Sequence, residues 1–184
     1  MAQMCLSRLL SRVRHWKAPA NARPEWLAEP YAKTQIDAWA SAVNSMNDVF
    51  LAFSSKARTT ANDINMFLTS RGVSVRNWEL HFAAGPTILE ELLKASRSCL
   101  GAIMLLTKDD ELLDAHGIAA PRDNVIFEMG MFMEAKGRER VLVVCEQGAK
   151  MPSDIGGGIY LSLINRDDIT SIHSRLTSFI DTRI

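Results

Sequence analysis

One acidic residue, Glu128, occupies a largely apolar stretch of the chain that is expected to form a helix. Val125, Met129 and Phe132 recur at the spacing of a single helical face, which predicts that this face packs against a core. Glu128 is then either an acid that only complements the helix dipole or a carboxylate placed for chemistry on a ligand. The second interpretation requires a binding site beside it.

The residues before Glu128 predict where its helix begins. Arg122 precedes Asp123 and Asn124, and either of the last two can accept hydrogen bonds from the free amides of the first turn. Glu128 then lies about one turn into the helix, where the positive helix end favours an ionised carboxylate. Gly137 is expected to end the helix.

Other kinds of chemistry have little support in the sequence. The histidines and cysteines are far apart and show no metal-ligand spacing: His15, His81, His116, His173, Cys5, Cys99 and Cys145. There is no GxGxxG motif, and Gly156–Gly158 do not follow a strand as a phosphate-binding loop would. Asp109 and Asp110 could bind a metal together with Asp154, but two acids directly after a strand are more typical of a turn. We therefore expect no metal site.

The composition is that of an ordinary globular domain. The 184 residues suit one domain with an added segment, and the 47% of apolar residues are enough for a core. The formal net charge is zero, so attraction to nucleic acid or to an anionic membrane is not expected. No apolar run reaches the roughly 20 residues that span a bilayer. Unpaired cysteines favour a reducing compartment, and we expect a cytoplasmic location.

Residues 1–46 are expected to form a helical extension that precedes an α/β domain of residues 47–184. Residues 1–24 contain several basic residues and no acid, and apolar residues share one helical face. Three interpretations remain open: a helix that docks on the domain or on a partner, a short helix on a membrane surface, and an organelle-targeting presequence. A second amphipathic segment, 31–46, follows a proline-punctuated linker.

From residue 48 onward, short apolar runs alternate with helical patterns. The expected strands are Val49–Phe53, Val73–Trp78, Leu100–Leu106, Val141–Cys145 and Tyr160–Leu163. The expected helices are Thr60–Ser70, Thr87–Leu93, the Glu128 helix and Asp168–Asp181, with irregular segments over Glu79–Pro86 and up to Ala120. This alternation predicts a five-stranded parallel sheet with helices on both faces.

Ligands of such sheets bind beyond the carboxyl ends of the strands. This rule places Ser54, Trp78, the segment Thr107–Asp110 and the start of the Glu128 helix on one rim of the domain. The sequence therefore predicts a binding site at this rim, with Glu128 beside it.

The chain from Val49 to Asp181 resembles the bacterial TIR-like domains of predicted nucleotide-binding proteins and of the STING-TIR effectors of antiphage systems. The resemblance rests on four segments in order: VFLAF, AIMLLTKDD, PRDNVIFEMGMFMEAKGRERVLVV and PSDIGGGIY. The third is the most specific, because an Arg-x-Asn pattern, a Glu-x-Gly helix and a Gly-Arg turn occur in register. The resemblance implies a TIR/flavodoxin-like fold.

The resemblance also implies NAD⁺ glycohydrolase activity, in which the bond between nicotinamide and ribose is cleaved and NAD⁺ is the substrate rather than a cofactor. Glu128 matches the helix glutamate that such enzymes use. Departure of nicotinamide leaves an oxocarbenium-like ribose, so a nearby carboxylate stabilises the positive charge that develops. A single carboxylate suffices, because nicotinamide carries its own positive charge and leaves without protonation.

Further residues are carried over from the resemblance. Phe53, Ser54 and Lys56 occupy the exit of the first strand, which lines the substrate cleft in TIR folds. Arg122 and Asn124 precede the glutamate and are expected to touch ribose or phosphate.

Three more positions are expected on the nucleotide-binding rim. Trp78 leads into the loop of residues 79–86, which in TIR domains gates the cleft and mediates stacking between subunits. Asp110 ends the third-strand segment, and Asp154 matches the aspartate of the family's Pro-Ser-Asp loop.

The chain departs from its relatives at two positions. Many of them carry a His-Gly pair where this chain has Ser54 and Ser55, which leaves the pyrophosphate contacts open. Other TIR enzymes carry an aromatic residue four positions before the glutamate, where this chain has Asn124. The second departure leaves open which side chain stacks on nicotinamide.

The resemblance implies a homo-oligomer held by TIR–TIR contacts and a sensor in a separate protein or in another portion of the chain. It leaves open the activating signal and whether the product is linear or cyclic ADP-ribose. Two other functions compete with the hydrolase. One is a scaffold without activity that signals through homotypic contacts, and the other is an enzyme like the nucleoside deoxyribosyltransferases, whose glutamate is a covalent nucleophile.

Overall fold

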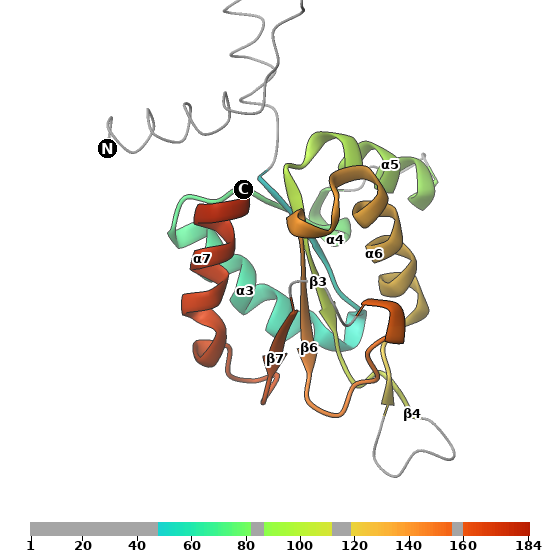
Figure 1. The fold of residues 1–184 in the computed structure, drawn as a ribbon, viewed down its shortest axis with the longest axis vertical. Helices are drawn as coiled ribbons and strands as arrows, with labels where there is room; N and C mark the ends of the chain where they lie inside the picture. The colour runs from blue at the N-terminus through green and yellow to red at the C-terminus, as the bar shows by residue number, and fades with distance from the viewer. Residues whose placement is uncertain (1–47, 82–86, 112–118, 156–159) are drawn as a thin grey trace, which may run out of the picture. The chain divides into compact units, whose positions relative to one another are not determined.

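The computed structural model describes residues 48–81, 87–111, 119–155 and 160–184. The expected helical extension of residues 1–46 lies outside these ranges. The chain forms a parallel five-stranded sheet in the order β2-β1-β3-β6-β7 (Figure 1). The strands are β1 Val49–Ala52, β2 Val75–Arg76, β3 Gly101–Leu106, β6 Val141–Glu146 and β7 Tyr160–Leu163. The expected parallel sheet is therefore confirmed.

The helices cover the sheet on both faces. They are α3 Arg58–Ser70, α4 Trp78–His81, α5 Ile88–Ser98, α6 Asp123–Lys136 and α7 His173–Arg183. Short 3-10 turns join the elements at η2 Ser55–Ala57, η3 Arg138–Arg140, η4 Ser153–Ile155 and η5 Thr170–Ile172. Helices α3 and α7 lie on one face of the sheet, and α5 and α6 lie on the other (Figure 1).

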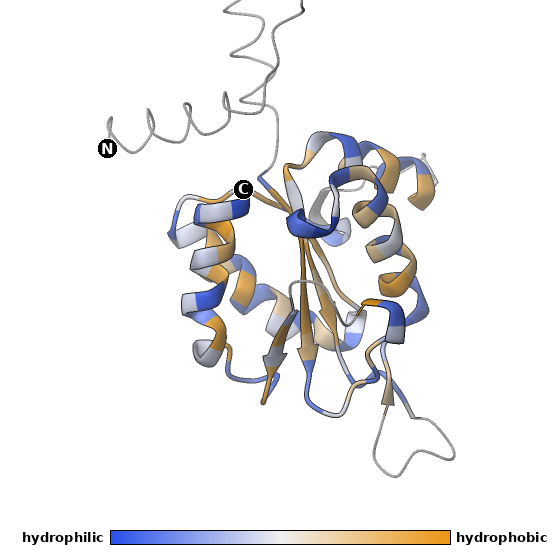
Figure 2. Cartoon of the chain, in the orientation of Figure 1, coloured by the Kyte–Doolittle hydropathy of each residue, from blue (hydrophilic) through white to orange (hydrophobic). Residues whose placement is uncertain are grey.

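The two cores follow from the alternation of side chains along each strand. In β1, Val49 and Leu51 face α3 and α7, whereas Phe50 and Ala52 face α5 and α6. Strands β1, β3 and β6 are buried along their whole length, as expected of a parallel sheet that is covered on both faces. Figure 2 shows these strands as an apolar centre, with polar residues concentrated on the outer helix surfaces and connections.

Local sequence signals account for several helix ends. Thr87 and Glu90 form the expected capping box, in which each side chain accepts a hydrogen bond from the other residue's backbone N–H. The helix that follows continues to Ser98, past the expected end at Leu93, because its apolar face remains packed in the core. Gly137 ends α6 as expected with φ at 80°, a conformation that L side chains rarely adopt.

The structure differs from expectation at the second strand. Only Val75 and Arg76 pair with β1, since the chain turns at Asn77 into the one-turn helix α4, which begins at Trp78. Part of the segment expected to be a loop after Trp78 is therefore helical.

A second difference follows β3. Asp110–Glu111 and Ala119–Ala120 form an antiparallel pair, β4 and β5, where the sequence indicated a turn and an irregular segment. Two-residue strands have no alternation that a sequence pattern could detect.

No helix in the described parts of the chain is both long and apolar enough to cross a membrane.

Candidate functional site

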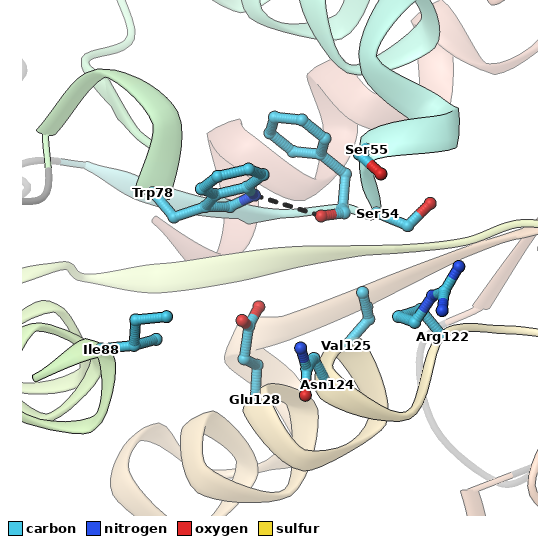
Figure 3. A pocket seen from close by; sticks show the side chains of 9 residues that line it. Ser54, Ser55, Trp78, Ile88, Arg122, Asn124, Val125 and Glu128 are labelled. Atoms are coloured by element: carbon cyan, nitrogen blue, oxygen red, sulfur yellow. Dashed lines mark hydrogen bonds between the residues drawn. The ribbon is translucent and has the colours of Figure 1, made fainter.

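A cavity of about 370 Å³ opens at the carboxyl edge of the sheet. It is lined by Phe53, Ser54, Ser55, Trp78, Ile88, Arg122, Asn124, Val125 and Glu128. Figure 3 shows two facing walls: Trp78, Ser54 and Ser55 on one side, and the α6 residues with Arg122 on the other. Cavities of roughly 300–1,000 Å³ are typical of small-molecule sites.

Strand β1 and helix α6 position the two walls. Strand β1 ends at Ala52, so Phe53 and Ser54 lie where the chain leaves the sheet, and η2 follows at Ser55. Helix α6 packs on β1 and β3 through Val125, Met129 and Phe132, as the spacing predicted. This packing turns the side of α6 that carries Glu128 toward the exit of β1 (Figure 3).

The Glu128 side chain points into the cavity, and the residue is only 7% exposed. Its Oε2 atom is buried and has no hydrogen-bond partner among the described residues. Buried polar atoms are nearly always paired, so an unpaired carboxylate oxygen at a cavity indicates that a ligand or water completes the site.

The protonation of Glu128 differs from expectation. Burial raises the pKa of this carboxyl group from 4.5 to about 7, whereas the helix end was expected to keep it ionised. Glu128 is the sixth residue of α6, and the field of a helix end falls off within the first turn. The group therefore changes charge near neutral pH.

Ser54 presents a second unpaired polar atom to the same cavity. The residue is 4% exposed, and its Oγ atom has no hydrogen-bond partner among the described residues. Ser54 lies across the cavity from Glu128 (Figure 3). Two buried oxygens without partners on opposite walls fit a ligand with hydroxyl groups between them.

Trp78 supplies the large aromatic surface of the cavity. Its indole N–H donates a hydrogen bond of 3.2 Å to the backbone carbonyl of Phe53, and the two rings lie 6.0 Å apart. The bond links α4 to the exit of β1 and restricts the orientation of the indole (Figure 3). A held aromatic ring at a cavity is suited to stacking on a planar base.

Arg122 brings positive charge to the wall that carries Glu128. Its guanidinium lies 3.3 Å from the carboxylate of Asp110 and remains 39% exposed. Arg122, and neither Asp123 nor Asn124, is the N-cap residue of α6, and its side chain makes no capping hydrogen bond. The Asp123 carboxylate does accept a hydrogen bond from one free amide of the first turn, the N–H of Asn124, as the sequence indicated.

The remaining expected site residues lie outside the cavity lining. Lys56 donates a hydrogen bond to the backbone carbonyl of Asp109, and Asp110 reaches the cavity only through its ion pair with Arg122. Asp154 is exposed in η4, where Ser153 donates a hydrogen bond to it. The structure thus unites Phe53, Ser54, Trp78, Arg122, Asn124 and Glu128 at one cavity, and does not place Lys56, Asp110 or Asp154 in its lining.

Three lining residues were not among those expected: Ser55, Ile88 and Val125. Val125 was assigned to the core, which it also joins. Ile88 is the first residue of α5, and it is 70% exposed although apolar. A helix that follows a strand starts at the carboxyl edge of the sheet, so the capping box at Thr87 was the signal that could have placed Ile88 on this rim.

The arrangement can bind a molecule that has a planar ring, hydroxyl groups and a phosphate. Trp78 offers a face to the ring, Ser54 and Glu128 offer oxygens to hydroxyls, and Arg122 offers charge to a phosphate. Across residues 48–81, 87–111, 119–155 and 160–184, no three His, Cys, Asp or Glu side chains are grouped to hold a metal ion.

Comparison with known proteins identifies curated relatives. The chain is 34% identical over 111 residues to CD-NTase-associated protein 12 of Sphingobacterium faecium, and the matched region covers 59% of this chain and 34% of the relative. It is 31% identical over 137 residues to the Pycsar effector protein PaPycTIR of Pseudomonas aeruginosa, covering 72% of this chain and 41% of the relative. The chain thus spans between a third and about two fifths of the length of these relatives.

Solved structures share the fold. The TIR domain of the Toll-related receptor TRR-2 from Hydra magnipapillata superposes with a TM-score of 0.58 at 12% identity, over 74% of this chain and 100% of that one. A TIR-STING receptor from C. gigas, in complex with 2′,3′-cGAMP, superposes with a TM-score of 0.55 at 17% identity, over 74% of this chain and 40% of that one. These neighbours establish the TIR fold.

A family model described as "CAP12/Pycsar effector protein, TIR domain" matches residues 48–172. The match begins one residue before β1 and includes every residue that lines the cavity. The chain therefore belongs to the family of CAP12/Pycsar effector TIR domains.

Proposed function

We propose that this TIR domain is an NAD⁺ glycohydrolase, which releases nicotinamide from NAD⁺ and forms linear or cyclic ADP-ribose. The observation that carries the proposal is the buried Glu128 carboxyl, which faces a cavity with an Oε2 atom that no residue in the described part of the chain binds. Ser54, Trp78 and Arg122 in the same lining supply contacts for the hydroxyls, a base and the phosphates of a dinucleotide.

In the proposed reaction, the bond between C1′ of the ribose and the pyridinium nitrogen breaks. The bonding electrons leave with nicotinamide, which becomes neutral, and the ribose becomes an oxocarbenium-like cation. The ionised Glu128 carboxylate stabilises this cation across the cavity. Water adds to C1′ and loses a proton to complete hydrolysis, or a second nucleophile within the dinucleotide closes a ring.

The cavity size fits one end of the substrate. A volume of about 370 Å³ holds a nicotinamide and its ribose, while the rest of the dinucleotide extends past Arg122. A cationic pyridinium beside Glu128 also favours the charged form of the carboxyl group, so binding the substrate promotes the ionisation that catalysis needs.

The names of the relatives suggest how the activity is controlled. One relative is named as associated with a CD-NTase and another as a Pycsar effector, and the matched regions make up less than half of each protein. We propose that the domain acts in antiphage defence, that self-assembly activates it, and that a nucleotide signal is sensed by a separate protein or by another part of a longer chain.

The direct test is nicotinamide release from NAD⁺ by the purified protein at high concentration. Release by the wild type and its loss in Glu128→Ala support the hydrolase. An exchange of bases between deoxynucleosides with NAD⁺ untouched would instead indicate a deoxyribosyltransferase. If no nicotinamide is released under any condition that promotes self-assembly, the scaffold without activity is the remaining interpretation.

The pH dependence of the reaction should follow Glu128. Because the carboxylate is the active form and burial raises the pKa of Glu128 to about 7, kcat/KM is expected to fall about tenfold per pH unit below 7 and to level off above it. The measurement is the rate of nicotinamide release at low NAD⁺ concentration from roughly pH 5.5 to pH 8.5, a range that brackets the pKa of Glu128. A flat profile across this range would contradict the assignment.

Trp78 is expected to supply the stacking surface that Asn124 cannot. Trp78→Ala should raise KM by about tenfold with little change in kcat, since stacking on an aromatic ring contributes about 1–3 kcal/mol per base. Trp78→Phe keeps a ring but loses the hydrogen bond to Phe53, and its KM should stay within about threefold of the wild type. An equal increase in KM in both variants would show that the hydrogen bond to Phe53, and not stacking, is what matters for binding.

A further inference from the structure

Asp109 does not line the cavity, but it contacts the η2 turn and the start of α6, which both do. The residue is 5% exposed and follows β3. One side-chain oxygen, Oδ1, accepts a hydrogen bond of 2.9 Å from the Thr107 hydroxyl. The other, Oδ2, accepts a hydrogen bond of 3.2 Å from the backbone N–H of Arg122.

The backbone of Asp109 makes two further links. Its N–H donates to the carbonyl of Ala120 at 3.2 Å, which ties it to β5. Its carbonyl accepts a hydrogen bond from the Lys56 side chain in η2, next to the exit of β1. One buried residue therefore connects the ends of β3 and β5, the first turn after β1 and the start of α6.

The start of helix α6 has no side-chain cap of its own. Its N-cap residue, Arg122, makes no side-chain capping hydrogen bond, whereas α5 has a complete capping box. The Arg122 carbonyl accepts hydrogen bonds from Val125 and Ile126 and so begins the helix, while the Arg122 N–H is held by Asp109.

The neighbouring acid holds the other end of the same arginine. Asp110 pairs with the Arg122 guanidinium, while Asp109 binds the Arg122 backbone. Two consecutive carboxyl groups thus contact Arg122, Asp109 at its backbone N–H and Asp110 at its guanidinium.

We infer that Asp109 is a positioning residue for the reaction proposed above, because it fixes the start of α6 and thereby places Arg122 and Glu128 opposite the exit of β1. Asp109 is not among the residues that line the cavity. Its effect is on geometry, and a displacement of about 1 Å in a reacting group can lower a rate by about a hundredfold. The expected change in kcat rests on the proposed function, whereas the expected role of Asp109 in holding the start of α6 does not.

The chain offers a matched control at the opposite end of the sheet. Asp48 is 6% exposed and directly precedes β1. Its carboxylate accepts hydrogen bonds from the N–H of Ser74 at 2.8 Å and from the Ser74 hydroxyl at 3.2 Å. The carboxylates of Asp48 and Asp109 thus both accept hydrogen bonds from a backbone N–H and a hydroxyl, but only Asp109 binds a residue of the cavity lining, Arg122.

The experiment compares Asp109→Ala with Asp48→Ala by hydrogen exchange and by steady-state kinetics. In Asp109→Ala, the amide of Arg122 is expected to exchange about tenfold faster, and kcat to fall about 10- to 100-fold. In Asp48→Ala, exchange at the start of α6 should be unchanged and kcat should stay within about twofold. Asp109→Asn keeps one acceptor oxygen and serves as the milder variant if alanine prevents folding.

Each outcome is decisive. Faster exchange at Arg122 together with a kcat loss confined to the Asp109 variants supports the inference. Unchanged exchange at Arg122, an unchanged kcat, or an equal loss in the Asp48 variant overturns it. If the wild type releases no nicotinamide, the proposed function fails, and the exchange comparison still decides whether Asp109 holds the start of α6.

Discussion

Glu128→Gln is expected to abolish nicotinamide release and at the same time to stabilise the domain. Loss of the carboxylate removes the charge that stabilises the ribosyl cation, so kcat should fall by at least about 10²–10³-fold. Glutamine has the shape of the neutral acid, and it avoids the cost of ionising a buried carboxyl group whose pKa is raised from 4.5 to about 7. At pH 8 the free energy of unfolding should rise by about 1–3 kcal/mol.

The stability gain has a defined pH dependence. The pKa of Glu128 is about 7 in the folded protein and 4.5 as the ordinary value. The stability that the neutral Glu128 gives the wild type is therefore fully present below pH 4.5 and is lost as the pH rises through about 7. The difference between Glu128→Gln and the wild type should therefore be small at pH 5 and largest above pH 7. Urea denaturation at pH 5 and pH 8 measures it.

Glu134→Gln is the matched control, because it makes the same substitution at an exposed position of the same helix. It should leave both activity and stability within experimental scatter of the wild type. A Glu128→Gln variant that is inactive but no more stable at pH 8 would show that Glu128 is not held as a desolvated acid.

Much of the fold could be predicted because its signals are local. Strands β1, β3 and β6 are continuous apolar runs, and the capping box of α5 is a four-residue pattern. The two-residue strands β4 and β5 carry no such pattern, and their pairing depends on how the chain returns after β3.

The candidate site could be predicted only in part. The rule that ligands bind at the carboxyl edge of a parallel sheet placed Ser54, Trp78 and Glu128 together, as the cavity lining does. The protonation of Glu128 could not be predicted, because burial depends on how α6 packs against β1 and on the depth of the cavity. The links made by Asp109 depend on tertiary contacts in the same way.

Arg166→Met is expected to cause a large loss of stability. Arg166 binds the buried carboxylate of Glu146 through two hydrogen bonds, of 3.0 Å from Nε and 2.5 Å from Nη2. The N–H of Lys108 donates a third, of 2.9 Å. Removing the guanidinium leaves a buried charge without its main partner, and such changes cost about 3–5 kcal/mol. Chemical denaturation at pH 7 measures the loss.

An exposed ion pair provides the control. Arg58 pairs with Glu79, but its side chain is 58% exposed, so Arg58→Met should cost less than about 1 kcal/mol. In the Arg166→Met background, the further change Glu146→Gln should recover a large part of the loss, because it removes the uncompensated charge. Similar small losses in the Arg58 and Arg166 variants would show that the buried pair does not stabilise the fold.

The pH dependence of this pair is opposite to that of Glu128. Burial alone would raise the pKa of Glu146, but the hydrogen bonds from Arg166 and Lys108 and their charges lower it below 4.5. The ionised Glu146 therefore stabilises the fold above pH 4.5, and this stabilisation is lost as the pH falls through the lowered pKa. The difference in the free energy of unfolding between the wild type and Arg166→Met should accordingly become smaller in acid. Two buried glutamates at the same edge of the sheet thus differ in their partners: Glu146 is bound by Arg166, whereas Glu128 faces the cavity with one oxygen that no described residue binds.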